Sequence, residues 1–297
     1  MRRLIPLFLV AVALSAGSGR AEAQGGTDVW VAPLRVSGSS VTLGRPRNVT
    51  ARAGYDNQPS FTPDGRAVMY TRIENGGPAD IWRVALAGGA PTRLTRTDIE
   101  SEYSATPMPD GSGFSVIRVE ADSTQRLWAF GWDGAPMRVI LPALKPVGYH
   151  VWIGESAIGA FVLGSPNALV LADPRTERVD TLGRNIGRAF ARAPGREAFT
   201  FVQVGDSALA PVAITEVDAR TGAVQGVLSA PAGVEYHVRL ADGSFILGTG
   251  SVIWHVRAGQ WSQLADLGVF GVRGISRIAI SPSLDQIAFV TEDAPAP

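Results

Sequence analysis

Two Tyr-His pairs and one glutamate are the residues of this sequence whose types could do chemistry together. They are Tyr149-His150 and Glu235-Tyr236-His237. Imidazole nitrogens and carboxylate oxygens bind divalent metal ions and transfer protons, so His150, His237 and Glu235 predict, as one hypothesis, a metal-dependent enzyme site. The alternative interpretation is that polar residues line a wet channel without any chemistry. The third histidine, His255, lies on a different predicted strand, in VIWHVRAG.

Two aspartates lie in identical Pro-Asp-Gly stretches, Pro63-Asp64-Gly65 and Pro109-Asp110-Gly111. Proline presets φ for a turn, the aspartate accepts local backbone N–H groups, and glycine supplies a positive φ. A catalytic carboxylate pair would instead have to converge to roughly 5–10 Å. We therefore interpret these aspartates as turn residues. In the repeat described next, the same turn position is occupied in successive units by Asp64, Asp110, Glu155, Pro194, Asp242 and Ser283.

The elements that position these residues recur along the chain. Residues 56–95 and 102–141 both read as strand, Pro-Asp-Gly turn, strand, loop, strand ending near a Gly turn, and a final short strand. The three units that follow keep the rhythm but have eroded turns, such as Pro194-Gly195 and Asp242-Gly243. A period of this length is typical of β-propeller blades.

The two ends of the chain complement each other. The last unit, IAISPSLDQIAFVTED, supplies only two strands, whereas residues 28–34 (DVWVAPL) resemble the third strand DIWRVAL of the first full unit, and residues 45–50 match its fourth strand in position. A sheet shared by both chain ends would leave no open edges. The sequence therefore predicts an all-β fold, a six-bladed β-propeller closed by pairing N-terminal strands with the last blade, as a single domain over residues 24–297.

The units NQPSFTPDG and YSATPMPDG, each followed by DIWRV or RLWAF and a Gly turn, resemble the TolB-like β-propeller family, the Pro-Asp-Gly variant of the WD-type blade. The resemblance implies either a periplasmic protein-interaction platform or the substrate-gating half of a prolyl-oligopeptidase-type enzyme. No G-x-S-x-G nucleophile motif accompanies it, so the hydrolase half is not expected. The separate α/β domain that precedes the propeller of TolB is not expected either, so a role in the Tol system does not carry over.

Aligning the units also predicts a ligand site where the innermost strands begin, at the mouth of the axial channel, where propellers usually bind ligands. The predicted ligand-binding residues are Asn57, Gln58, Tyr103, Tyr149, His150, Arg188, Glu235, Tyr236, His237 and Arg277. The tryptophans Trp30, Trp82, Trp128 and Trp254 recur on third strands, where we expect packing between blades rather than a binding stripe.

Residues 1–23 are predicted to be a secretory signal peptide, with Arg2 and Arg3, an apolar run from Leu4 to Leu14, and cleavage after Ala23. The chain has no cysteine, which excludes disulfides and thiol catalysis. Cleavage removes three arginines and one glutamate from 27 residues of each sign, leaving 24 basic and 26 acidic residues. We expect a periplasmic or secreted monomer without a membrane span, without a nucleic-acid partner and without a cofactor.

Two functions follow from these observations. The first is an exported, non-enzymatic TolB-like propeller that binds a protein or peptide on its axial face. The second is a small propeller enzyme of lyase, lactonase or hydrolase type, with a metal or ligand at the channel mouth.

Overall fold

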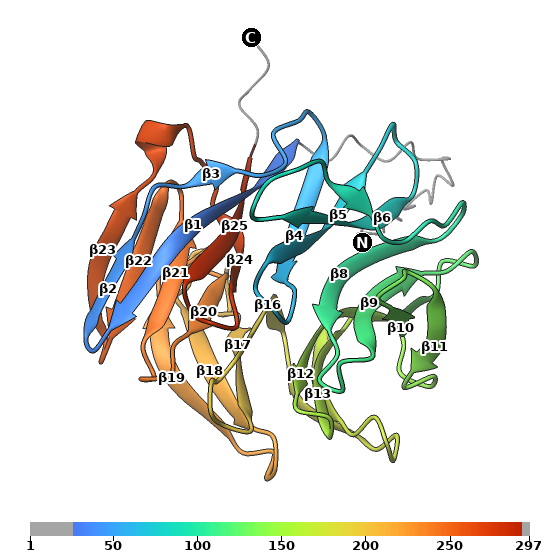
Figure 1. Cartoon of the computed structure of the whole chain (residues 1–297). Coiled ribbons are helices and arrows are strands. Elements are labelled where there is room, and N and C mark those ends of the chain that lie inside the picture. The colour runs from blue at the N-terminus through green and yellow to red at the C-terminus, as the bar shows by residue number, and fades with distance from the viewer. Residues whose placement is uncertain (1–25, 293–297) are drawn as a thin grey trace, which may run out of the picture.

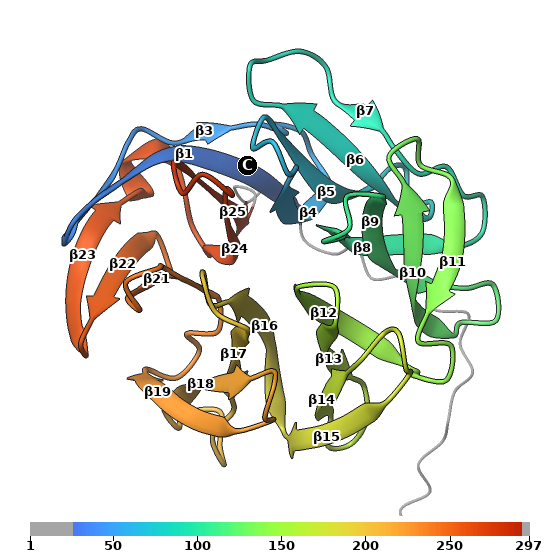
Figure 2. The same ribbon diagram turned by 60° about the horizontal axis from the view of Figure 1, so that its bottom comes forward.

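Antiparallel four-stranded sheets arranged around a central axis make up most of the computed structural model, which describes residues 26–292. The signal-peptide prediction lies outside these residues. Figure 1 shows the sheets from the side, and Figure 2 shows their radial arrangement, which is that of a β-propeller. The described residues contain one short 3-10 helix, η1 (Gly268–Phe270), and no helix long and apolar enough to cross a membrane.

Four sheets contain four strands each, and their strands follow one another along the chain from the axis to the rim. Their bounds are β8 (Ser101–Pro107), β9 (Gly113–Val119), β10 (Gln125–Gly131) and β11 (Pro136–Ile140); β12 (Val147–Ile153), β13 (Ala157–Val162), β14 (Ala168–Ala172) and β15 (Val179–Arg184); β16 (Ile186–Arg192), β17 (Ala198–Gln203), β18 (Val212–Asp218) and β19 (Val224–Ala230); β20 (His237–Arg239), β21 (Phe245–Thr249), β22 (Val252–Arg257) and β23 (Gln260–Asp266).

A nine-stranded sheet holds both ends of the described chain, in the order β24-β25-β1-β4-β5-β6-β7 with β2 and β3 also paired to β1. Its strands are β1 (Thr27–Ser37), β2 (Ser40–Leu43), β3 (Arg47–Asn48), β4 (Tyr55–Phe61), β5 (Ala67–Ile73), β6 (Ala79–Ala85), β7 (Thr92–Arg93), β24 (Ser276–Ile280) and β25 (Gln286–Glu292). Strand β1 pairs antiparallel with β25 from Thr27 opposite Glu292 to Pro33 opposite Gln286. By contrast, β1 meets β4 at a single parallel pair, Thr27 and Tyr55. The short hairpin strand β2 is not predicted by the repeat.

The second strand of each unit is almost wholly buried, whereas the rim strands β11, β15 and β19 are largely exposed. Second strands such as β17, which reads AFTFVQ, are covered by neighbouring sheets on both faces, and so they are nearly continuous apolar runs. The core of the described residues is divided into six hydrophobic clusters, of which five lie between successive sheets and one lies within the nine-stranded sheet. One of them packs Val29 and Val290 against Val68 and Tyr70.

Of the recurring tryptophans, Trp82, Trp128 and Trp254 lie on the third strands β6, β10 and β22, and Trp30 lies on β1. Trp30, Trp82 and Trp128 each pack against one of these hydrophobic clusters. The rings of Trp82 and Trp128 are also covered by the guanidinium groups of Arg72 and Arg118, at 4.2 and 4.8 Å. These contacts give the tryptophans a packing role in the fold.

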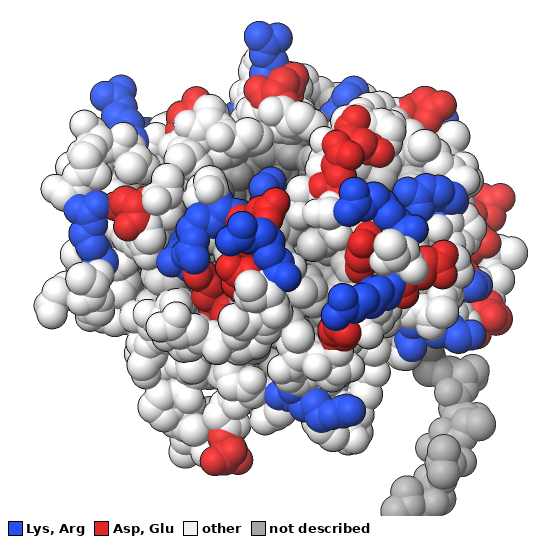
Figure 3. Space-filling view, turned by 90° about the horizontal axis from the view of Figure 1, so that it is seen from below, with Lys and Arg blue, Asp and Glu red and all other residues white. Residues whose placement is uncertain are grey.

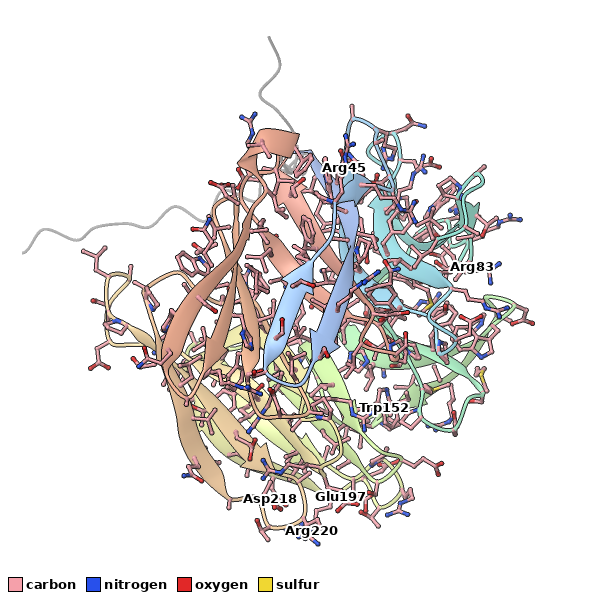
Figure 4. The ribbon with its side chains drawn as sticks, turned by 60° about the vertical axis from the view of Figure 1, so that its left-hand side comes forward. Arg45, Arg83, Trp152, Glu197, Asp218 and Arg220 are labelled. Atoms are coloured by element: carbon pink, nitrogen blue, oxygen red, sulfur yellow. The ribbon has the colours of Figure 1, made fainter. Side chains whose placement is uncertain are left out.

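The turns that join the first and second strands of each unit gather at one end of the ring, which we call the corner end. Figure 4 shows Glu197, which precedes β17, beside Asp218 and Arg220 at this end. The innermost strands begin at the opposite end, which we call the leading end. Figure 3 shows the corner end from below, where basic and acidic side chains are interspersed and the middle of the face is hollowed.

Candidate axial binding site

A cavity of about 130 Å³ lies on the axis, where the innermost strands β4, β8, β12, β16, β20 and β24 come together. Each of these strands, or the residue directly before it, contributes a side chain from the same position of the repeat. These residues are Gln58, Ser104, Tyr149, Arg188, Tyr236 and Arg277. The cavity therefore brings together residues from nearly the whole described chain, and their chemistry differs from one strand to the next.

Seven of the ten predicted site residues line this cavity, and three do not. The seven are Gln58, Tyr149, His150, Arg188, Tyr236, His237 and Arg277. Asn57 is instead buried against β1, where its amide Nδ2 donates to Thr27 Oγ1 at 3.2 Å. Tyr103 packs against the hydrophobic cluster between the β8–β11 and β12–β15 sheets. The carboxylate of Glu235 accepts a hydrogen bond from the backbone N–H of Arg188.

Ser104, rather than its neighbour Tyr103, faces the cavity because of a β-bulge. The register of β8 against β9 shifts between Tyr103 and Thr106, and Ser104 has φ +56°. Gln58 and Arg277, at the equivalent positions of β4 and β24, have φ +56° and +52°. Left-handed φ values are uncommon outside glycine, and such backbone strain concentrates at functional sites. Alignment alone shows the equivalent positions but not which of two adjacent residues the bulge turns inward.

The two cavity histidines bind hydroxyl groups of the preceding sheet. His150 Nε2 hydrogen-bonds Ser115 Oγ at 2.7 Å, and Trp152 Nε1 donates to the same oxygen at 2.9 Å. Two sheets further round the ring, His237 Nε2 hydrogen-bonds Thr200 Oγ1 at 2.8 Å. Ser115 and Thr200 occupy equivalent positions on the second strands β9 and β17. We call these pairs the histidine-hydroxyl contacts.

Burial keeps both histidines neutral. His150 is 8% and His237 2% exposed. Burial lowers the pKa of His150 to about 3 and that of His237 to about 4, because an imidazolium would lose its hydration there. The two neutral imidazoles therefore act as hydrogen-bonding groups that link one sheet to the next.

The metal-site hypothesis does not fit this geometry. The Nε2 atoms of His150 and His237 are occupied by hydroxyl groups, and the Glu235 carboxylate is occupied by a backbone N–H. Within residues 26–292, no three His, Cys, Asp or Glu side chains are grouped so that they could hold a metal ion. The three residues that suggested metal chemistry therefore have structural partners.

Arg277 is the central cation of the cavity. Its guanidinium lies 4.9 Å from the ring centre of Tyr149 and 4.8 Å from that of Tyr236, and its Nη2 donates to Tyr149 Oη at 3.1 Å. Burial raises the pKa of Tyr55, at the start of β4, and the positive charge of Arg277 nearby partly opposes this shift. Sequence alignment did not single out Tyr55, because it precedes the aligned position. The aromatic side chains fix the position of the charge.

The turn aspartates are where the repeat predicted them and have local partners. Asp64 Oδ1 accepts hydrogen bonds from Thr62 Oγ1 at 2.6 Å and from Arg66 N at 3.0 Å, which lower the pKa of its carboxyl group. Asp110 accepts in the same way from the N–H of Ser112 at 3.0 Å. These carboxylates stabilise turns and do not converge on a substrate.

Two further carboxylates are fully buried away from the cavity. Burial raises the pKa of Asp56 to about 6 and that of Glu102 to about 7, although Arg52 and Arg118 partly oppose the shifts. Both groups lie between sheets and form ion pairs with these arginines. Because these pKa values are raised, the contribution of the two carboxyl groups to the stability of the folded chain is greatest at low pH. This contribution is lost as the pH rises toward neutrality.

Comparison with known proteins places the fold among β-propellers. No family model matches the chain. A 43-residue segment is 44% identical to the Tol-Pal system protein TolB of Bordetella pertussis; it makes up 14% of this chain and 10% of that protein. The match thus spans about a tenth of the length of the curated relative. A solved structure assigned as TolB from Agrobacterium tumefaciens is similar with a TM-score of 0.70 and 14% identity, covering 91% of this chain and 99% of that one.

Other similar structures differ in function. TolB from Acinetobacter baumannii has a TM-score of 0.60 at 12% identity, and the match covers 90% of this chain and 64% of that one. A gluconolactonase from Xanthomonas campestris has a TM-score of 0.62 at 11% identity over 88% of this chain and 95% of its own. At these identities the similarity shows the fold alone. The chain has a TolB-like β-propeller fold that binding proteins and enzymes share.

Proposed function

We propose that this protein is an exported, six-bladed β-propeller that binds a protein or peptide segment at the leading end of its axis and catalyses no reaction. The axial cavity carries the proposal, because every innermost strand supplies a side chain to it from one position of the repeat. A purely structural ring would not require such different side chains at equivalent positions.

The count of six and the closure rest on the sheet pairing and on the core. We infer that the nine-stranded sheet comprises two blades, since β1 meets β4 at only one residue pair. The blade β24-β25-β1 would then be completed by β2 and β3. The six hydrophobic clusters would be the six interfaces between blades, and the cluster around Val29 and Tyr70 would join the last blade to the first. Such closure leaves no exposed sheet edge at the junction.

Binding without catalysis is favoured by the side chains that line the cavity. They include phenol, amide, hydroxyl and guanidinium groups but no carboxylate, and both histidines have hydroxyl partners. A general base with an accessible lone pair is therefore not provided by these residues. The similarity to Tol-Pal system proteins supports a protein partner in the periplasm.

Site-specific photo-crosslinking tests the proposed function. A benzophenone amino acid replaces Ile99, which is 71% exposed between β7 and β8 at the leading end, or Met137, which is 52% exposed on the rim strand β11. Irradiation in cells of the source organism is expected to give one dominant adduct from position 99 and none from position 137. Equal labelling at both positions, or none at position 99, would contradict the proposal.

A further inference from the structure

The charge of the axial cavity is one-sided. Arg188 and Arg277 are its charged lining residues, and no aspartate or glutamate lines it. Neither guanidinium forms an ion pair with a carboxylate of residues 26–292, although twelve other ion pairs are formed there. A guanidinium group stays charged at every relevant pH. The lining of the cavity is therefore positively charged; the carboxylate of Glu235 lies beside it, on the backbone N–H of Arg188, but forms no ion pair with either guanidinium.

Arg277 is positioned before any ligand binds. Its contacts with the two tyrosine rings and with Tyr149 Oη hold the guanidinium on the axis. Because the side chain is already fixed, ligand binding loses less side-chain conformational entropy. Guanidinium groups favour carboxylates, which they can bind through two parallel hydrogen bonds.

Two neighbouring side chains add hydrogen-bonding capacity. Gln58 Oε1 accepts hydrogen bonds from Thr71 Oγ1 at 2.8 Å and from Ser104 N at 3.1 Å, which orients the amide group and leaves its NH2 as the donor. The buried hydroxyl of Ser104 has no hydrogen-bond partner among the described residues. A buried polar group without a partner is costly, and an incoming acceptor would remove that cost.

Exposed apolar side chains lie in loops at the leading end. Because neighbouring strands are antiparallel, segments that precede an innermost strand and segments that follow a second strand both lie at the leading end. Ile99 and Val269 precede β8 and β24, and Leu209 follows β17; they are 71%, 84% and 90% exposed. These residues belong to loops of three different units, so a segment that lies across the leading end could contact more than one of them.

We propose that the axial cavity binds the carboxylate of an aspartate or glutamate side chain within an extended, apolar-flanked segment of a partner protein. This inference rests on the proposed function and specifies its ligand. The carboxylate would pair with Arg277 and Arg188 and accept hydrogen bonds from Gln58 and Ser104. The apolar residues of the segment would pack on Ile99, Leu209 and Val269. A cavity of this volume suits a single side chain rather than a folded module.

A displayed library of random linear dodecapeptides tests the inference. Selection on the wild-type protein is expected to enrich peptides with one internal acidic residue between apolar residues. In the synthetic peptide, Glu→Gln or Asp→Asn substitution should weaken binding roughly tenfold or more, and so should Arg277→Gln or Arg188→Gln in the protein. Arg188 is exposed, so its substitution tests the charge even if Arg277→Gln perturbs folding. Arg83→Gln, at an exposed position on β6, is the matched control and should bind normally.

The outcomes separate the two proposals. Coupling between the peptide substitution and Arg277→Gln in a double-mutant cycle would support the carboxylate site. Enriched peptides that bind at the leading end without an acidic residue, or that lose binding only when a free C-terminus is amidated, would overturn the inference and leave the proposed function standing. Failure of both the selection and the crosslinking at position 99 would overturn the proposed function itself.

Discussion

At the scale of single residues, each of the two histidine-hydroxyl contacts joins two successive sheets through residues far apart in the sequence. Ser115 is 35 residues from His150, and Thr200 is 37 residues from His237. Removing one hydroxyl leaves a buried imidazole nitrogen without a partner. Such a loss costs about 1–3 kcal/mol of unfolding free energy.

We therefore predict that Thr200→Val, which keeps the side-chain shape, lowers the unfolding free energy by about 1–3 kcal/mol. Ser115→Ala should cost at least as much, because Trp152 Nε1 loses its acceptor as well. Urea denaturation measures both changes. Thr42→Val, at an exposed position on β2, is the control and should stay within about 0.5 kcal/mol of the wild type. Similar stabilities for all three variants would show that the contacts contribute nothing.

The pKa of His237 predicts how the stability depends on pH. Its pKa is about 4 in the folded chain, lowered from 6.5. The unfolded chain therefore takes up a proton that the folded chain does not, so the stabilisation is present above the unfolded pKa of 6.5 and is lost as the pH falls.

Accordingly, the stability of the wild type relative to His237→Gln should fall by on the order of 1–2 kcal/mol between pH 7 and pH 5. Denaturation curves at both pH values measure this difference. Because the difference between two variants is compared, the opposite effects of Asp56 and Glu102 cancel. A difference that is independent of pH would mean that His237 titrates normally.

At the scale of elements, glycine sets how closely two blades approach. A Cβ added to Gly159 on β13 would lie 2.7 Å from the ring of Phe199 on β17. Gly159 occupies the position at which β9 and β17 carry the hydroxyl residues of the histidine-hydroxyl contacts. On β9, β13 and β17 this position therefore carries either a hydroxyl bound to histidine or no side chain, according to the neighbouring blade.

We predict that Gly159→Val lowers the unfolding free energy by about 1–3 kcal/mol, because the added side chain must displace the Phe199 ring. Thermal unfolding measures the loss. Gly226→Ala on β19 is the matched control, since its Cβ would meet no atom within 4 Å. Phe199→Leu should restore part of the stability of Gly159→Val; failure to do so would mean that another contact is responsible.

Local chemistry explains how much of these elements could be predicted from the sequence. Pro63-Asp64-Gly65 forms a turn through neighbouring residues alone, so the turn and the strands beside it were predictable. The roles of Ser104 and Tyr103 were exchanged because a bulge depends on pairing with β9. His150 and His237 were predicted to lie at the channel mouth, and they line the cavity, but their hydroxyl partners in the preceding sheet have no signature in the sequence, which left the metal-site alternative open. The two cavity arginines were correctly brought together, because they occupy one position of the repeat.

At the scale of the whole molecule, the two described chain ends lie next to each other in one sheet. Thr27 pairs with Glu292, the last described residue of β25. A short linker could therefore join them, and the chain could be opened elsewhere. Exposed turns tolerate such new ends far better than buried strands do.

A circular permutant that links Glu292 to Thr27 and begins at Gly89 should fold to a propeller with a melting temperature close to that of the wild type. Gly88 and Gly89 form an exposed turn between β6 and β7. Circular dichroism and thermal unfolding measure the result. The same linker with new ends between Thr200 and Phe201, inside the buried strand β17, is the control and should not fold. Failure of the first permutant would contradict the closure of the ring.

The pairing of β1 with β25 also sets an order of events during folding. As the chain emerges from the amino end, β1 is made first among the described strands, but its partner in the sheet, β25, is made last. Until then Val29 and Val31 can pack against Val68 and Tyr70 of β5 but lack their strand partners in β25. Contacts between such distant segments form slowly, and an unpaired strand edge promotes aggregation. Pairing of β25 with β1 is therefore a step that must wait until the last described strand has been made.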